Sequence, residues 1–208
     1  MSADLITPLF TRSDGQYLCA RWGRPIVPVV FGTDDTTLAV VKAAVEAVVV
    51  MAGHRMAETD PELGANLMFF FVRDWNELLG VKDLNRLIDG LDGLVARLDA
   101  AGASQYRAFR FEGSGAIKAA FVFLRMDATL AQMPAADLAL LQAVQVILLW
   151  SDRAFAQVSP LAQVEGLGVV RPEIAAVIRA AYDRVMPPVA RDPSHALRLA
   201  ARTSVVLP

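Results

Sequence analysis

The chain has 208 residues, which is enough for one domain with a substantial hydrophobic core. Hydrophobic residues make up 55% of it and charged residues 20%, a composition that argues against disorder. Twenty basic and 22 acidic residues give a net charge of -2. The chain therefore has no overall positive field for a phosphate backbone, and we expect no nucleic-acid partner.

Two further classes are excluded by simple counts. Cys19 is the only cysteine, so no intramolecular disulfide can form. The longest uncharged apolar run, from Leu138 to Ser151, is shorter than the ~20 residues that a membrane span needs. Residues 1–10 contain Asp4 and lack the basic and apolar regions of a signal peptide. We expect a cytoplasmic protein, or a periplasmic one if a leader has been removed.

The first half of the chain predicts alternating strands and helices. An irregular segment is expected over residues 1–20, followed by a β-branched strand over 25–31. Apolar residues at three- and four-residue spacing predict a helix over 36–52, with Lys42 and Glu46 on its polar side. Residues 66–72 are apolar on both faces, which is typical of a strand covered on both sides. A helical stripe predicts one helix over 83–101, despite Gly90 and Gly93.

The second half predicts a hairpin and then helices. Phe109 and Phe111 share one face of a strand over 106–112, and the Gly113-Ser114-Gly115 turn leads into a strand over 116–124. Residues 134–150 are apolar nearly all round and predict a buried central helix, and further helices are expected over 172–186 and 193–203. The sequence thus predicts a single α+β domain over 1–208: a mixed sheet of about four strands covered by helices, closed by a C-terminal helix and tail over 193–208.

Familiar catalytic motifs are missing. The two histidines, His54 and His195, lie far apart in sequence, whereas a zinc hydrolase commonly places two histidines one helical turn apart. There is no Gly-x-Ser-x-Gly elbow, no dinucleotide fingerprint and no Walker A sequence, and Gly166-Leu167-Gly168 fits a loop better than a nucleotide cradle. We therefore expect no cofactor and no metal.

The remaining polar candidates surround the predicted central helix. Asp127 precedes this helix and Asp152 follows it, so both could border a cleft, although an aspartate at such a position is commonly a cap. Gln142 and Gln145 lie on the helix, and Glu165 follows it. These five residues form the candidate cleft. For the two glutamines, hydrogen bonds within the core are the alternative.

Several segments together resemble a proteobacterial family of uncharacterised, zincin-like secreted proteins. The resemblance is carried, in order, by Arg21-Trp22-Gly23-Arg24-Pro25 with the strand that follows, Gly53-His54, Ala65-Asn66-Leu67, the run from Ala116 to Asp127, and the run from Ile178 to Pro187. It implies a zincin-like fold with a buried metal-binding helix. In this chain, however, Leu141 and Gln142 stand where that helix would carry two glutamates, so the zinc-peptidase signature is absent.

Three hypotheses follow from the sequence. The first is a non-catalytic zincin-like domain that serves as a binding or structural module for a protein or small-molecule ligand. The alternative is a hydrolase that uses Asp127, Asp152, Glu165 and His54. The third is homo-oligomer formation through the C-terminal helices and the apolar tail, Val205 to Leu207, since exposed apolar patches often mark contacts.

Overall fold

The computed structural model describes residues 1–203, and it confirms the α+β class. Its centre is a four-stranded mixed sheet in the order β2-β3-β5-β4. β2, β3 and β5 run parallel, and β4 pairs antiparallel with β5 and forms one edge. The four strands are β2 (Pro28–Phe31), β3 (Leu67–Val72), β4 (Gln105–Phe111) and β5 (Ile117–Arg125).

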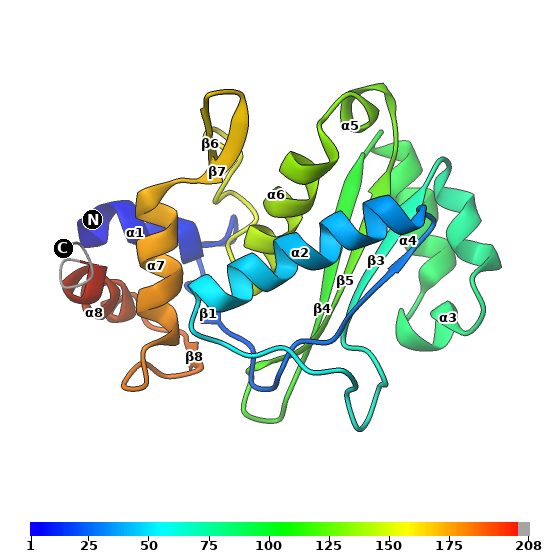
Figure 1. The fold of residues 1–208 in the computed structure, drawn as a ribbon. Coiled ribbons are helices and arrows are strands. Elements are labelled where there is room, and N and C mark those ends of the chain that lie inside the picture. Colours follow the sequence, from blue (N-terminus) through cyan, green and yellow to red (C-terminus); the bar gives the residue numbers. More distant parts are fainter. Residues whose placement is uncertain (204–208) are drawn as a thin grey trace.

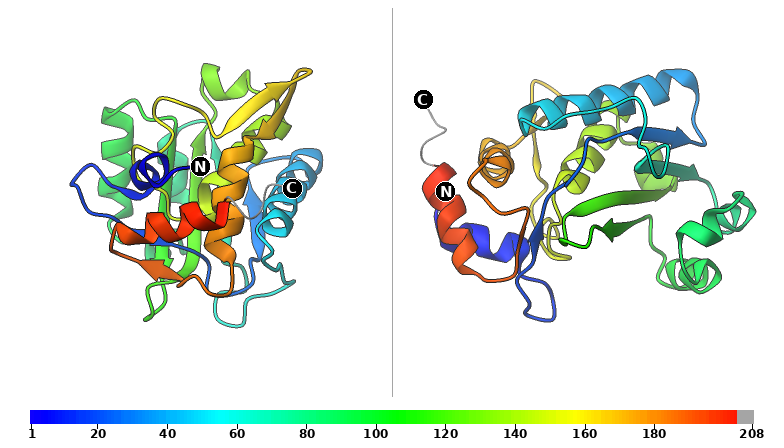
Figure 2. Two further views of the ribbon diagram at one scale, coloured as in Figure 1. Left: turned by 90° about the vertical axis from the view of Figure 1, so that its left-hand side faces the viewer. Right: turned by 90° about the horizontal axis from the view of Figure 1, so that it is seen from below.

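Helices cover both faces of this sheet (Figure 1). One face packs on α2 (Asp35–Met51) and α6 (Ala135–Ile147). The other packs on η1 (Trp75–Gly80), α3 (Leu84–Leu87) and α4 (Leu91–Ala100). The right-hand view of Figure 2 shows the sheet between these two layers. β3 is apolar on both sides because it lies in the middle and contributes to both cores.

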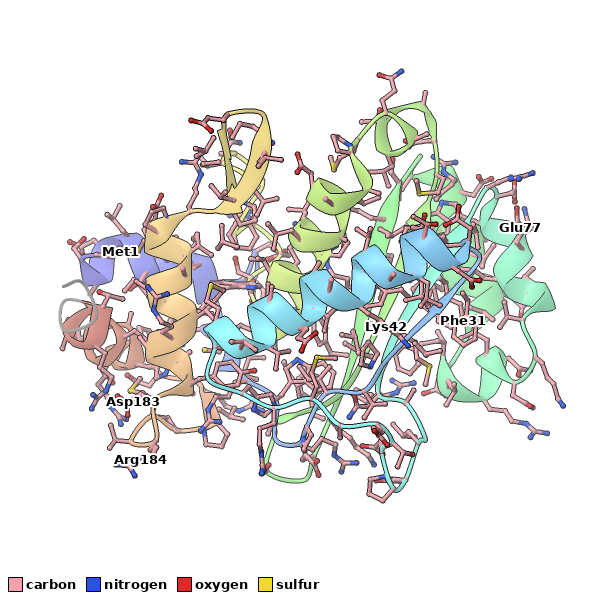
Figure 3. All side chains as sticks on the ribbon, in the orientation of Figure 1. Met1, Phe31, Lys42, Glu77, Asp183 and Arg184 are labelled. Carbon is pink, nitrogen blue, oxygen red and sulfur yellow. The ribbon has the colours of Figure 1, made fainter. Side chains whose placement is uncertain are left out.

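α2 confirms the helix predicted over 36–52. The Asp34 side chain accepts a hydrogen bond from the Thr37 amide and so caps its first turn. Val41 and Val45 are buried on the inner side, whereas Lys42 lies on the exposed side (Figure 3). This amphipathic division holds α2 against α6 and the sheet.

The single helix predicted over 83–101 is wrong, because the chain breaks it into α3 and α4. Ile88 is extended, and Gly90 adopts a positive φ of 65° directly before α4 begins. A left-handed residue cannot continue a right-handed helix, and glycine adopts that conformation without the steric cost of a Cβ. The apolar stripe survives the break, since Leu84, Leu91 and Leu94 all face the same core.

The central helix is shorter than the 134–150 range that the sequence predicts. α6 ends at Ile147, and Leu148 begins an extended segment. The Leu149 amide donates to the Ala20 carbonyl, and the Trp150 indole donates back to the Val144 carbonyl. Backbone pairing with a distant segment therefore replaces the last helical turn, and this pairing leaves no signal in the local sequence.

Residues 1–20, expected to be irregular, contain α1 (Ala3–Phe10) and β1 (Cys19–Ala20). Ile6 and Phe10 are fully buried, so tertiary packing stabilises this short helix although Pro8 lies inside it. α1 lies beside α8 (Ser194–Thr203), as both views in Figure 2 show, and α8 confirms the last predicted helix. The apolar tail, Val205 to Leu207, lies outside the described residues.

The helix predicted over 172–186 is present as α7, but it ends at Tyr182. Five further elements, α7 among them, complete the described residues. They are α5 (Ala128–Ala131), β6 (Leu161–Val164), β7 (Leu167–Val170), α7 (Pro172–Tyr182) and β8 (Val189–Ala190). β6 and β7 form a hairpin that the sequence pattern does not predict, and β1 pairs with β8. Among residues 1–203, no helix combines the length and apolarity needed to cross a membrane.

Candidate functional site: a cleft beside β4

A cleft lies beside edge strand β4, lined by residues of β4, by the end of α6 and by the segment that follows α6. Its volume is about 520 Å³. Its walls carry two arginines, several aromatic rings and few acidic groups. The lining residues are Arg12, Gln105, Tyr106, Arg107, Phe109, Gln145, Leu149, Trp150, Ser151, Asp152, Phe155 and Ala156.

The side chains of β4 that point toward α6 form the floor of this cleft. Successive side chains of a strand point to opposite faces, so Gln105, Arg107 and Phe109 share the face toward α6. Tyr106 and Ala108 pack on the opposite side, in the core formed with α4. An arginine is thus directed toward the helix layer, where an apolar side chain would be the ordinary choice.

Arg107 has amide partners and no carboxylate partner. Its Nη1 donates to Gln142 Oε1 at 2.8 Å and to Gln105 Oε1 at 3.0 Å. Within residues 1–203, no aspartate or glutamate forms an ion pair with it. Burial lowers the pKa of Arg107 to about 10, which still leaves the guanidinium charged at neutral pH.

Gln142 completes this cradle from α6. It is only 1% exposed, and its Nε2 donates to Gln105 Oε1 at 3.0 Å while its own Oε1 accepts from Arg107. Two neutral amides therefore orient the guanidinium without cancelling its charge. A partly desolvated charge that lacks an opposite charge is costly, so this arrangement favours an anion that arrives from outside.

Gln145 stands one turn further along α6 and lines the cleft. Its Oε1 is buried without a hydrogen-bond partner among the described residues. A buried polar atom in this state calls for an explanation, and a ligand or water donor in the cleft is one that chemistry allows.

Aromatic rings form the apolar wall. Trp150 stacks on Phe10 with ring centroids 5.2 Å apart and meets Phe155 edge-on at 5.1 Å. Its indole nitrogen already donates to a carbonyl, so the ring offers mainly its apolar surface. Phe109 adds a further ring from the floor.

The lining of the cleft also includes a positively charged side chain, Arg12, and a negatively charged one, Asp152. Asp152 Oδ1 accepts from the Ser13 amide at 2.9 Å, which ties the turn that carries Arg12 to the end of the cleft. Hydrogen bonds from Ser13 lower the pKa of Asp152, and the nearby charge of Arg12 lowers it further. Asp152 is therefore ionised and engaged at neutral pH, and it acts mainly as an anchor for this turn.

The structure brings three of the five predicted site residues together and separates the other two. Gln145 and Asp152 line the cleft, and Gln142 holds its arginine. Asp127 instead caps α5: it accepts from the amides of Thr129 and Leu130, both at 3.0 Å, and from the Ser104 hydroxyl. These hydrogen bonds, that of Ser104 first, lower its pKa.

Glu165 also lies away from the cleft, in the turn of the β6–β7 hairpin, at a positive φ of 52°. Next to it, Gly166 has a φ of 80°, and the Gly168 amide donates to Asp137 Oδ1. Of the loop expected at Gly166-Leu167-Gly168, only Gly166 lies in the turn, because Leu167 and Gly168 belong to β7.

The two histidines lie apart from each other and from this cleft. His54 Nε2 contacts the Arg24 carbonyl at 2.8 Å, and His195 Nδ1 contacts the Tyr17 hydroxyl at 2.9 Å. Burial lowers the pKa of both and brings that of His195 to about 4. Over residues 1–203, no group of three or more histidine, cysteine, aspartate or glutamate side chains is placed to hold a metal ion.

Arg107 is the functional candidate that sequence reasoning missed. The signal was present, because Arg107 shares its strand parity with Phe109 and Phe111, which were already assigned to one face. An arginine on the face that carries the aromatic rings is directed inward, and it needs either a partner or a purpose.

Comparison with known proteins adds no further constraint: the chain matches no protein-family model, no curated protein and no solved structure. The function must therefore be argued from the cleft itself.

Proposed function

We propose that this protein is a non-catalytic binding domain, and that the cleft beside β4 takes a small ligand with an anionic group, either a carboxylate or a phosphate. One observation carries the proposal: Arg107 is a half-buried, charged guanidinium held by Gln105 and Gln142 alone. A ligand anion would supply the missing opposite charge, and a guanidinium can bind a carboxylate or phosphate through two parallel hydrogen bonds.

The surroundings of Arg107 support a ligand that also has an apolar part. Phe109, Trp150 and Phe155 offer ring surface beside the guanidinium, and Arg12 adds a second positive charge at the rim. The lining thus combines polar side chains with ring surface, which suits a small ligand that has both an anionic group and an apolar part. The cleft lacks an acid, base or nucleophile in a catalytic arrangement, so binding is the function that it supports best.

The resemblance to zincin-like proteins enters as a second part of this proposal. Gln142 stands where that family would carry a glutamate, and a glutamate there would lie against Arg107 and neutralise it. We infer that replacing the acid with an amide removed the metal-peptidase chemistry and freed a positive charge in the same step. The buried position of α6 supports this interpretation.

The proposal is tested by titrating the protein with phenylphosphate, benzoate and neutral benzyl alcohol while recording the tryptophan indole NMR signals. Trp150 lines the cleft and reports on binding, whereas Trp75 packs in the opposite core and serves as an internal control. We expect saturable shifts of Trp150 with at least one anion and none with the alcohol. The two anions show whether phosphate or carboxylate is preferred.

Two variants assign the effect to Arg107. Arg107→Met should abolish the response of Trp150 to the anions. Gln142→Glu should weaken the apparent affinity measured at Trp150 at least about tenfold, because the new carboxylate competes for the guanidinium. Arg86→Gln, on the exposed face of α3, is the matched control and should leave binding unchanged. Equal binding of benzyl alcohol, or full anion binding by Arg107→Met, would contradict the proposal.

A further inference from the structure

A second cleft is lined by residues of several segments that resemble the zincin-like family, among them residues 21–25 and 53–54. The function proposed above does not involve this cleft. Its volume is about 480 Å³. It is built from the stretch after β1, the turn after α2, the β4–β5 hairpin turn and the chain before β8. The lining residues are Arg21, Trp22, Gly23, Arg24, Pro25, Gly53, His54, Arg55, Ser114, Ala116 and Pro188. There is no aspartate or glutamate among them.

Two of the three arginines in this lining lack an acidic partner. Arg24 forms ion pairs with Asp60, Glu62 and Glu112. Within residues 1–203, neither Arg21 nor Arg55 forms any ion pair. The positive charge of the cleft therefore comes from Arg21 and Arg55.

Arg21 is fixed in place and incompletely satisfied. Its guanidinium lies over the Tyr182 ring, 5.4 Å from the centroid, and its Nη2 reaches the Met186 carbonyl at 3.4 Å. Its Nε is buried without a partner among the described residues. Tyr182 is itself held, because its hydroxyl donates to the Ile147 carbonyl at 2.8 Å. The side chain is thus pre-positioned, while part of its hydrogen-bonding capacity is unused.

His54 adds a ring whose orientation is also fixed. Its Nε2 contacts the Arg24 carbonyl at 2.8 Å, and its ring packs 5.1 Å from that of Tyr182. A carbonyl oxygen can only accept, so Nε2 carries the proton in the neutral ring and Nδ1 is left without a partner among residues 1–203. Gly53 turns the chain at a positive φ of 67°, which places His54 and Arg55 directly after α2.

We propose that this cleft is a second anion site, separate from the one beside β4, and that it takes an oxyanion group such as phosphate, sulfate or carboxylate between Arg21 and Arg55 beside His54. The proposal is carried by two cationic side chains without acidic partners, converging on one acid-free cleft from segments far apart in the chain. Charge-assisted hydrogen bonds from guanidinium groups are the interaction that such a group needs.

The chain contains two histidines, which makes the test direct. Inorganic phosphate, sulfate and acetate are each titrated at constant ionic strength, and the ring signals of both histidines are followed by NMR. We expect a saturable shift of the His54 signals and none of His195, which is buried against Tyr17 and lines neither cleft. The order of affinity among the three anions distinguishes a tetrahedral from a planar ligand group.

Variants separate a site from a general salt effect. Arg55→Gln changes an exposed side chain and should leave the fold intact while weakening the apparent affinity at least about tenfold, and Arg21→Gln should do the same. Arg86→Gln and Arg107→Met should leave the His54 response unchanged, so failure of this site is distinguishable from failure of the β4 cleft. A non-saturating shift, a parallel shift of His195, or an unchanged response in both Arg21→Gln and Arg55→Gln would overturn the proposal.

Discussion

Arg24 and Arg107 are both drawn into the protein body, but their charges are balanced in different ways. Arg24 meets three acids, with distances of 3.2 Å to Asp60, 3.4 Å to Glu62 and 2.7 Å to Glu112. Arg107 meets only the amide oxygens of two glutamines. The Arg24 cluster ties the loop before β3 to the β4–β5 hairpin and is complete in itself. Arg107 keeps its charge available, which separates a structural arginine from a candidate binding residue.

Asp60 shows how complete the Arg24 cluster is. Its carboxylate is 2% exposed and also accepts from the amides of Glu62 and Leu63 and from Asn66 Nδ2. Burial acts to raise its pKa, but the backbone hydrogen bonds, Arg24 and Asn66 together outweigh burial and lower it. Every partner of this carboxylate belongs to the protein, so nothing is left for a ligand.

The largest effect is expected from Asp60→Ala. The substitution removes one of the three acids around Arg24, one of the two acceptors of Asn66 Nδ2 and the side-chain acceptor of two backbone amides. Breaking a buried pair on one side typically costs about 3–5 kcal/mol. Urea unfolding followed by circular dichroism measures the loss. A cost below about 1 kcal/mol would mean that the cluster is no tighter than a surface ion pair, and the contrast with Arg107 would fail.

Arg107→Met should act in the opposite direction on stability. Replacing a half-buried charge that has no opposite charge with an apolar side chain removes a desolvation cost, which offsets the about 1 kcal/mol that a lost hydrogen bond typically costs. We therefore expect the free energy of unfolding to be unchanged or higher. Gln105 and Gln142 can still bond to each other, since Nε2 of Gln142 donates to Gln105 Oε1. The same unfolding experiment decides. A clear loss of stability would make Arg107 a structural residue like Arg24.

His195 is a third side chain enclosed by the protein, but unlike the two arginines it becomes neutral when it is buried. Burial, followed by the charge of Arg198, lowers its folded-state pKa to about 4, whereas the unfolded value is near 6.5. The unfolded chain therefore binds the proton more readily, so the contribution is complete above pH ~6.5 and is lost as the pH falls toward ~4. Between neutral pH and pH ~5 we expect a loss on the order of 2 kcal/mol from this residue.

The measurement is urea unfolding as a function of pH, with His195→Gln as the matched variant. His54 has a lowered pKa for the same first reason and contributes with the same sign, so the difference between wild type and His195→Gln isolates the buried residue. A pH dependence that is identical in the two proteins would show that His195 titrates normally, and that burial against Tyr17 does not keep it neutral.

Local pattern predicted the fold better than it predicted the site. β3 and α2 follow from apolar periodicity, which depends on neighbours in the chain. The break at Gly90 and the early end of α6 could not be predicted, because the first depends on a backbone conformation and the second on pairing between Leu149 and Ala20. The candidate cleft was found through Gln145 on its helix. Arg107 was missed because its importance lies in the absence of a carboxylate partner, which only the folded chain reveals.

The smallest effect is expected at the exposed end of the same strand. Arg110 reaches Asp89 at 3.4 Å, and the Asp89 side chain is 90% exposed. Water screens such a pair, so Asp89→Asn should change the free energy of unfolding by less than about 0.5 kcal/mol. Arg107 and Arg110 lie three residues apart on β4 and therefore point to opposite faces of the sheet. Asp89→Asn could be as destabilising as Asp60→Ala only if burial had little influence on the strength of an ion pair. In that case the lack of an acidic partner at Arg107 would no longer indicate a ligand site.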